Sequence, residues 1–183
     1  MTADSHTRTN KRTLWKILSI LLDYPEPSLL DALPDLHAVL DEVPDCGAKA
    51  ACREFIAYLA GNPLHLLQEE YTRVFDLHPP ACLNVSCHSH ADGHERGWEL
   101  ARFTQAYQRA GFDPVAGELP DFLPMVLEFM YVSPEATAAG MLKGIQPAVR
   151  SLALNLLEVH SPYAALVKAI ADWREECSME GDA

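Results

Sequence analysis

The chain has 183 residues, of which 49% are hydrophobic and 22% charged, proportions typical of an ordinary soluble globular domain. Its formal net charge of −12 argues against a nucleic-acid-binding protein, because neutralising phosphates requires clustered Lys and Arg. No stretch approaches the roughly 18 apolar residues of a membrane-spanning helix, and residues 1–12 lack the apolar core of a signal peptide, so we expect a cytoplasmic protein without stable membrane insertion, whose five cysteines stay reduced.

In the first half of the chain, apolar residues recur at helical spacing in four segments, which proline and glycine residues separate. The Tyr24-Pro25 pair ends the first segment, Pro34 predicts a kink in the second, and Gly61 ends the third. Asn62 and Pro63 fit the cap and the first position of the fourth. The pattern predicts helices over residues 14–22, 29–40, 52–59 and 64–75.

The middle of the chain, about residues 76–92, is expected to be an irregular, hinge-like loop, since it carries Pro79 and Pro80 and no helical pattern. Asp92 and Glu95 then have the spacing of a capping box. A long helix is therefore predicted over residues 93–110, with Gly111 after it.

The sequence of the last third of the chain predicts three more helices and no strand. One covers residues 119–131, and the Ser133-Pro134 and Ser161-Pro162 pairs begin helices over about 134–159 and 162–176. Hairpin signals between alternating β-branched runs are missing. We therefore expect a single all-α domain, a multi-helix bundle of seven to nine helices over residues 13–176, between disordered tails at 1–12 and 177–183.

The segment from Glu118 to Met130 combines two prolines and three carboxylates with many apolar residues. Asp121 and Glu128 are seven residues apart, so on one helix they share a face. Pro124 lacks a backbone N–H, so it either bends this helix or lies in its first turn. The segment predicts an acidic rim backed by apolar residues, an arrangement better suited to holding a partner than to covalent chemistry.

A second notable segment is Gln68 to Phe75, where Tyr71 belongs to an apolar stripe and Glu70 lies off it. One interpretation is a core helix with a solvated edge. The other is that Glu70 and Tyr71 border a groove shared with Asp121. Such a groove, apolar below and acidic at its lip, fits a basic amphipathic helix.

A cluster of thiols and imidazoles occupies the middle loop. It is a candidate zinc site because both groups bind zinc well, but its spacing is poor and no second ligand pair closes the site. We favour a loop whose histidines bond to the backbone, and keep a zinc-binding regulatory domain as the alternative. The candidate ligands are Cys82, Cys87, His88, His90 and His94.

Catalytic motifs are missing from the sequence: there is no nucleophile elbow, phosphate-binding loop or dinucleotide-binding turn. Paired carboxylates such as Glu69-Glu70 are typical of solvated helix surfaces. A small hydrolase using Cys87 and His88 is only a remote third hypothesis. We expect no enzyme and no cofactor.

Several motifs together resemble the nitrate reductase delta-subunit family, the NarJ/TorD-type maturation chaperones. They occur in the family's order over about residues 14–172, and each alone is weak. The matching pieces are Leu22-Asp23-Tyr24-Pro25, Leu67 through Asp76, His88-Ser-His90 followed by Glu95-Arg96-Gly97, Glu118 through Pro124 with Glu128-Phe129, and Ser161-Pro162-Tyr163.

The resemblance implies an all-helical, non-catalytic chaperone that binds the N-terminal segment of a molybdoenzyme's catalytic subunit until the molybdenum cofactor is inserted. By similarity, Glu118, Pro120, Asp121 and Pro124 form the groove element, with His88 and His90 in the hinge loop. Cys87 stands where the family pattern has Glu. The client enzyme, any nucleotide binding, and the choice between a monomer and a domain-swapped dimer stay open. The predicted peptide-binding residues are Glu70, Tyr71, His88, His90, Glu118, Pro120, Asp121, Pro124 and Glu128.

Overall fold

The computed structural model describes residues 3–89, 93–114 and 117–173, with side chains in the first helix described from Arg12 onward. Across these residues the regular secondary structure is helical, and the one β-feature is an isolated antiparallel bridge between Asn84 and Phe122. The predicted all-α class is therefore confirmed. No helix in the described ranges is long and apolar enough to cross a membrane.

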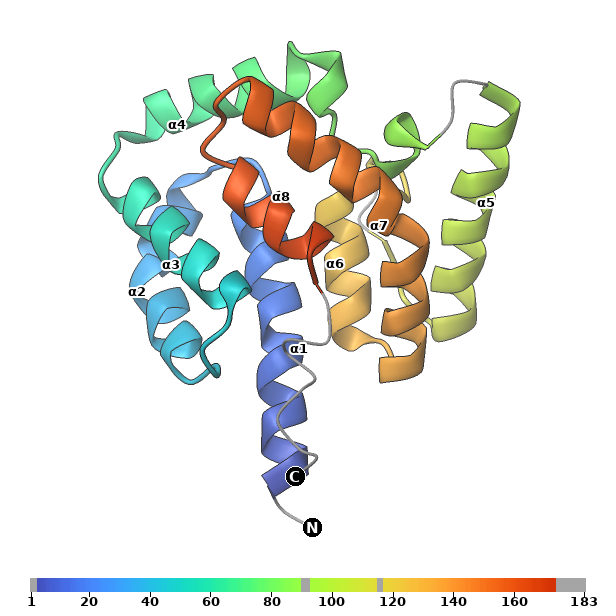
Figure 1. Cartoon of the computed structure of the whole chain (residues 1–183), viewed down its shortest axis with the longest axis horizontal. Helices are drawn as coiled ribbons and strands as arrows, with labels where there is room; N and C mark the ends of the chain where they lie inside the picture. Colours follow the sequence, from blue (N-terminus) through green and yellow to red (C-terminus); the bar gives the residue numbers. More distant parts are fainter. Residues whose placement is uncertain (1–2, 90–92, 115–116, 174–183) are drawn as a thin grey trace.

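Eight α-helices form the bundle in the described part of the chain (Figure 1). Pro and Gly punctuate them as expected: Pro124 lies in the first turn of its helix, and Gly111 adopts a left-handed conformation with φ 65° just after another. The helices are α1 (Ala3–Leu21), α2 (Pro27–Asp41), α3 (Gly47–Ala60), α4 (Leu64–Tyr71), α5 (Gly93–Ala110), α6 (Leu123–Val132), α7 (Glu135–Glu158) and α8 (Ala164–Ala171).

Helix α1 runs through the middle of the bundle, and its N-terminal end extends past the other helices (Figure 1). Its apolar residues Leu14, Leu18 and Leu21 are buried against neighbouring elements, and α1 packs on α6 and α3. Helix α8 fills the space between α3 and α7. Burying these apolar stripes stabilises a bundle whose helices are mostly too short to be stable alone.

Several expected helix boundaries change. Helix α1 begins at Ala3, within the stretch assigned to a polar tail, where no apolar stripe indicated a helix. The helix predicted from residue 64 to 75 is α-helical to Tyr71 and continues as a π-helical turn, η1 (Thr72–Asp76). Helix α8 begins at Ala164 rather than at 162, after Tyr163. The C-terminal tail lies outside the described residues.

The middle loop contains two short 3₁₀ turns, η2 (Pro79–Ala81) and η3 (Val85–His88). After the loop, α5 runs along one side of the bundle (Figure 1). The aromatic rings of Tyr107 and Phe112 pack on Phe129 of α6, with ring centroids 4.8 and 5.5 Å away. These contacts fix α5 relative to α6.

Candidate functional site

Asp121 lies at the centre of the candidate site, but its position differs from the expected one. Helix α6 begins at Leu123, so Asp121 precedes the helix and does not share a helical face with Glu128. Its side chain is fully buried, 0% exposed, instead of lying at an acidic lip. The sequence pattern could not show this, because the residues that cover Asp121 come from a segment 35 positions earlier.

Segment 83–86 runs antiparallel to segment 121–123 and holds the Asp121 carboxylate. The backbone N–H of Val85 donates to the Asp121 carbonyl (3.0 Å), and that of Leu123 donates to Leu83 (2.9 Å). One carboxylate oxygen accepts the Ser86 N–H (2.9 Å) and hydroxyl (2.5 Å), and the other accepts the Asn84 amide (3.1 Å). Three donors satisfy the buried charge, as a buried carboxylate requires.

The network continues into α5. The guanidinium of Arg96 donates to the Ser86 hydroxyl (3.0 Å), and the Tyr107 hydroxyl donates to the Pro120 carbonyl (2.6 Å). Asp121 and Pro120 are therefore anchored to the middle loop and to α5 before α6 begins. This arrangement gives both residues a positioning role for the chain that leads from Glu118 into α6.

Tyr71 is also buried, and the negative charges of three carboxylates act on its hydroxyl group. Burial raises the pKa of Tyr71, and the negative charges of Asp23, Asp76 and Glu118 raise it further, together with the ionisation of Tyr163. The three acids are exposed. Asp23, Asp76 and Glu118 come from three separate segments, and each charge acts on the same hydroxyl group. That Glu70 and Tyr71 border a groove shared with Asp121 stays a prediction.

Aromatic side chains back this acidic surface. The ring of Tyr24 meets that of Tyr71 edge-on, with centroids 5.2 Å apart, and remains 41% exposed. Tyr71 continues into a buried cluster with Phe75 and Tyr163. Leu119 beside Glu118 is 44% exposed. We name Asp23, Tyr24, Asp76, Glu118 and Leu119 the acidic surface.

Glu70 is a further acid of the predicted site, and its carboxylate is held in an ion pair. It makes a two-pronged ion pair with Arg73 on the same helical turn (2.8 and 2.6 Å). Its charge raises the pKa of Tyr58 and Tyr163, after the effect of burial, and it is absent from the charges that act on Tyr71. The Glu70 charge is therefore partly neutralised.

Pro124 and Glu128, in the segment from Glu118 to Met130, hold α6 against α1. The Pro124 carbonyl accepts a hydrogen bond from the Ser19 hydroxyl (2.8 Å), and Glu128 forms an ion pair with Lys16. Pro124 is buried and Glu128 is half-buried. Both residues face α1, so they stabilise the packing of α6.

The Cys/His loop does not assemble a metal site from the described residues: no three His, Cys, Asp or Glu side chains gather there closely enough to hold an ion. Nε2 of His88 instead lies 2.7 Å from the Cys82 carbonyl oxygen, as expected for a loop whose histidines bond to the backbone. His94 is exposed on α5. His90 lies outside the described residues.

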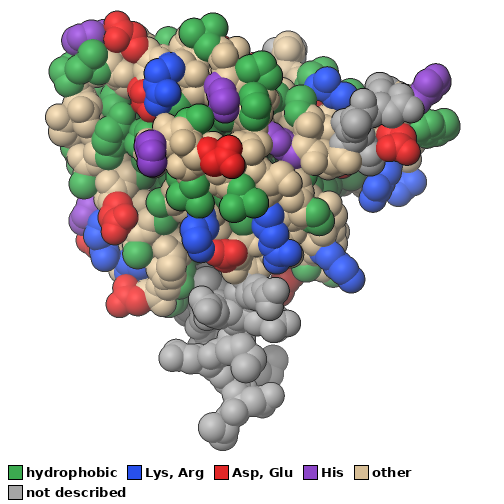
Figure 2. Space-filling view, turned by 45° about the horizontal axis from the view of Figure 1, so that its top comes forward, with side chains coloured by type: hydrophobic (Ala, Val, Ile, Leu, Met, Phe, Trp, Pro, Cys, Tyr) green, Lys and Arg blue, Asp and Glu red, His purple; other side chains and the backbone are tan. Residues whose placement is uncertain are grey.

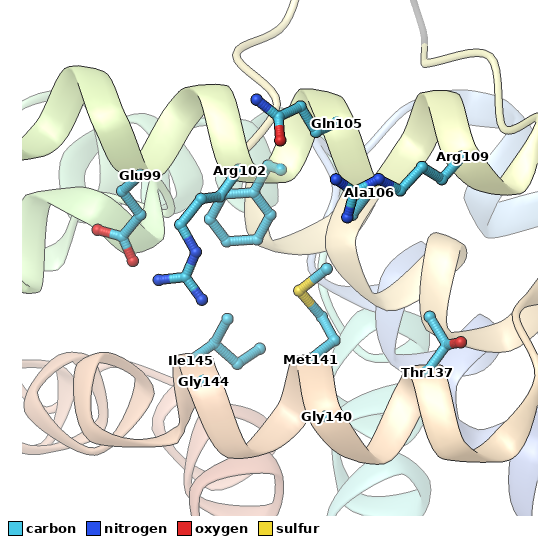
Figure 3. A pocket seen from close by; sticks show the side chains of 11 residues that line it. Glu99, Arg102, Gln105, Ala106, Arg109, Thr137, Gly140, Met141, Gly144 and Ile145 are labelled. Atoms are coloured by element: carbon cyan, nitrogen blue, oxygen red, sulfur yellow. The ribbon is translucent and has the colours of Figure 1, made fainter.

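A second surface feature is a groove of about 310 Å³ between α5 and α7 (Figure 3). Phe103, Met141 and Ile145 form its apolar floor, while Arg102 and Arg109 line its α5 wall. Glycines 140 and 144 on α7 leave its other side open. The sequence analysis did not identify this groove, because it depends on how two helices pack.

On the face shown in Figure 2, hydrophobic, acidic and basic side chains are interspersed, and no one charge sign forms a continuous field. Sequence reasoning missed the roles of Asn84, Ser86 and Arg96 around Asp121, and among these the Glu95-Arg96-Gly97 match pointed to Arg96.

Comparisons with known proteins agree with this architecture. A family model described as nitrate reductase delta subunit matches residues 42–169. The probable nitrate reductase molybdenum cofactor assembly chaperone NarJ of Bacillus subtilis (strain 168) is 30% identical over 162 residues, which cover 88% of each protein.

Two further relatives differ in how much of their own length the similar region covers. The probable nitrate reductase molybdenum cofactor assembly chaperone NarW of Escherichia coli (strain K12) is 28% identical over 155 residues, 85% of this chain and 65% of that protein. The nitrate reductase-like protein NarX of Mycobacterium tuberculosis (strain ATCC 25618 / H37Rv) is 34% identical over 158 residues, 86% of this chain but 24% of that protein. The similar region therefore also occurs within a much longer protein.

Proposed function

This chain belongs to the nitrate reductase delta subunit family, and we propose that it is a non-catalytic assembly chaperone for a nitrate reductase-like molybdoenzyme. In this proposal it acts in the cytoplasm. It binds the N-terminal segment of the catalytic subunit and keeps that subunit competent for insertion of the molybdenum cofactor. The chaperone itself holds no cofactor.

The observation that carries the proposal is that three exposed carboxylates from separate segments, Asp23, Asp76 and Glu118, all act on the buried Tyr71 hydroxyl. Exposed aromatic and aliphatic side chains, Tyr24 and Leu119, lie in the same segments as two of these acids. Acids beside apolar side chains complement a basic amphipathic helix, which buries its apolar face and neutralises the acids. The net charge of −12 adds a long-range attraction for such a segment.

The predicted peptide-binding residues divide into two roles in this proposal. Glu118, and to a lesser extent the ion-paired Glu70, contact the client segment. Six others position the surface from beneath or from the side, because they are buried or engaged with neighbouring helices: Tyr71, His88, Pro120, Asp121, Pro124 and Glu128. His90 lies outside the described residues, and its role in the hinge loop stays a prediction.

The α5–α7 groove is the rival surface for the same segment. Its α5 wall carries two arginines, Arg102 and Arg109, and one acid, Glu99, a net positive charge that would repel a basic helix. We therefore assign the client segment to the acidic surface. A variant pair in the groove, Arg102→Gln with Arg109→Gln, separates the two assignments.

The test is titration calorimetry of the full chain with a synthetic peptide of the client's N-terminal segment. Neutralising the acidic surface with Asp23→Asn, Asp76→Asn and Glu118→Gln is expected to weaken binding by about tenfold. The matched control removes three charges from α2 and α3, with Asp31→Asn, Asp35→Asn and Glu54→Gln. Equal losses in both triple variants would contradict the assigned surface, and no binding by the wild-type chain would contradict the proposed function.

A further inference from the structure

Two thiols lie side by side in the middle loop. The sulfur atoms of Cys82 and Cys87 are 3.4 Å apart, within hydrogen-bonding distance for sulfur. Cys82 is half-buried and Cys87 is exposed, so an oxidant in solution can reach the pair. A disulfide needs an S–S separation of about 2.05 Å, which leaves an approach of roughly 1.4 Å to small rotations of the two side chains.

We propose that Cys82 and Cys87 form a reversible intramolecular disulfide, which makes this loop an oxidation-sensitive modification site. The proposal goes beyond the chaperone function and does not depend on it. Nothing in the client-binding surface requires a thiol at either position.

The environment assigns different roles to the two sulfurs. The Cys82 sulfur accepts a hydrogen bond from the backbone N–H of Asn84 (3.3 Å) and lies 3.4 Å from the side-chain oxygen of the same residue. Desolvation, followed by the hydrogen bond and the charge of Cys82, raises the pKa of Cys87 to about 11 despite the nearby Arg96. In the proposal, Cys82 is the thiol that attacks the oxidant, and Cys87 is the thiol that resolves the product.

The reaction balances with a peroxide as the two-electron oxidant. The Cys82 thiolate attacks one peroxide oxygen, the O–O bond breaks, and the departing hydroxide becomes water with the proton that Cys82 released. Cys82 is then a sulfenic acid. The Cys87 sulfur attacks the Cys82 sulfur, the S–O bond breaks, and hydroxide leaves with the Cys87 proton as a second water. An external dithiol reverses the change by thiol–disulfide exchange.

A disulfide between Cys82 and Cys87 would also affect the elements that pack around this loop. Asn84 and Ser86, which hold the Asp121 carboxylate, lie between the two cysteines in sequence. Turn η3, which contains Cys87, packs against both α5 and α7. A covalent link here constrains the segment that joins the middle loop to the start of α6.

Other cysteines in the chain provide an internal control. Cys52 is fully buried in α3, and burial, together with the charge of Cys46, raises its pKa to about 12. It is shielded from solvent oxidants and should stay reduced. Trypsin separates the candidates, because Cys82 and Cys87 fall together in the peptide 74–96, while Cys52 falls in 50–53 and Cys46 in 17–49.

The experiment treats the reduced full chain with hydrogen peroxide, blocks free thiols with N-ethylmaleimide under denaturing conditions, and analyses the tryptic peptides by mass spectrometry. The expected result is a peptide 74–96 that has lost two hydrogens and takes no label, and that recovers two labels after reduction with dithiothreitol. Cys52 should take its label throughout.

Two variants test the assigned order. With Cys87→Ser, Cys82 should accumulate as a sulfenic acid that dimedone traps; with Cys82→Ser, oxidation of Cys87 should slow by about tenfold. Circular dichroism verifies that both variants fold. The thiol-labelling experiment on the wild-type chain tests the disulfide even if a variant does not fold. The proposal is overturned if peptide 74–96 keeps two labels after peroxide, if it is oxidised only to sulfinic acid, or if it is cross-linked to a second chain.

Discussion

Ser86 donates both its backbone N–H and its hydroxyl to one carboxylate oxygen of Asp121, at 2.9 and 2.5 Å. Both residues are fully buried. The pair joins the middle loop to the start of α6, and Arg96 of α5 extends it by donating to the Ser86 hydroxyl. Three elements far apart in sequence therefore depend on one carboxylate.

Replacing Asp121 with Ala should lower the free energy of unfolding by about 3 kcal/mol, because a buried N–H, a hydroxyl and an amide lose their charged acceptor. Urea denaturation followed by circular dichroism measures this loss. The exposed neighbour provides the control: Glu118→Ala should change stability by less than about 0.5 kcal/mol. Equal, small effects at the two positions would show that the Asp121 network contributes little.

The effect of Asp121→Ala on client binding should then be indirect. Since the side chain is buried, any loss of affinity comes from movement of the Glu118 segment and not from a lost contact. Ser86→Ala, which removes one donor and leaves the acid in place, should weaken binding by a smaller factor in the same direction. If Ser86→Ala left both stability and binding unchanged, the positioning role of the network would be wrong.

Much of this fold follows from local sequence rules. The start of α5 at Gly93 and its end before Gly111 match the capping-box and glycine signals, and Pro124 falls in the first turn of α6 as its missing N–H demands. These features depend on a few adjacent residues, so a single sequence is enough to predict them.

The candidate site was only partly predictable, since it depends on contacts between distant segments. The acids at 118 and 121 look alike in sequence, yet one is exposed and the other is fully buried. What separates them is the pairing of segment 83–86 with 121–123, which no local pattern encodes. For the same reason, the sequence did not indicate that the charges of Asp23 and Asp76 act on Tyr71, because this depends on how the helices pack.

Two glycines on α7 should respond to Ala in the opposite way from Gly111. An added Cβ meets nothing within 4 Å at Gly140 or Gly144, so Gly140→Ala and Gly144→Ala should each stabilise the chain by about 1 kcal/mol through helix propensity. At Gly111, where φ is 65°, the same change should destabilise it by about 1 kcal/mol. Thermal unfolding of the three variants measures the signs.

The α7 variants also probe the groove between α5 and α7. Their methyl groups narrow a surface that we do not assign to the client segment. Client-peptide affinity should therefore stay within about twofold of the wild type. A larger loss in Gly140→Ala or Gly144→Ala, without a loss of stability, would shift the assignment from the acidic surface to the groove.

Alkaline pH should destabilise the chain through its buried tyrosines. Burial raises the pKa of Tyr71, Tyr107 and Tyr163 in the folded state, whereas unfolded tyrosines ionise near pH 10. Above about pH 10 the unfolded state releases protons that the folded state keeps. The free energy of unfolding should therefore hold below about pH 9 and then fall, by about 1.4 kcal/mol per pH unit for each tyrosine.

Phenolate absorbance measured alongside unfolding tests this account. The chain has six tyrosines, and the three buried ones should ionise only when the chain unfolds. Tyr71→Phe should remove one tyrosine's share of the pH dependence with little effect at pH 7, because its hydroxyl makes only a long 3.5 Å contact with the Leu22 carbonyl. An unchanged slope in this variant would place the Tyr71 hydroxyl in contact with solvent.

Client binding should depend on salt, and the acidic surface should account for that dependence. Charges at an exposed rim attract a basic segment through water, so raising the ionic strength from about 0.05 to 0.5 M shortens the Debye length and should weaken binding several-fold. In the triple variant Asp23→Asn, Asp76→Asn, Glu118→Gln, the affinity should be lower at low salt and nearly independent of salt. The control triple on α2 and α3 should keep most of the wild-type slope, because its charges lie away from the bound segment. Calorimetric titrations at four salt concentrations give the slopes, and an identical slope in all three proteins would mean that net charge, and not this surface, attracts the client.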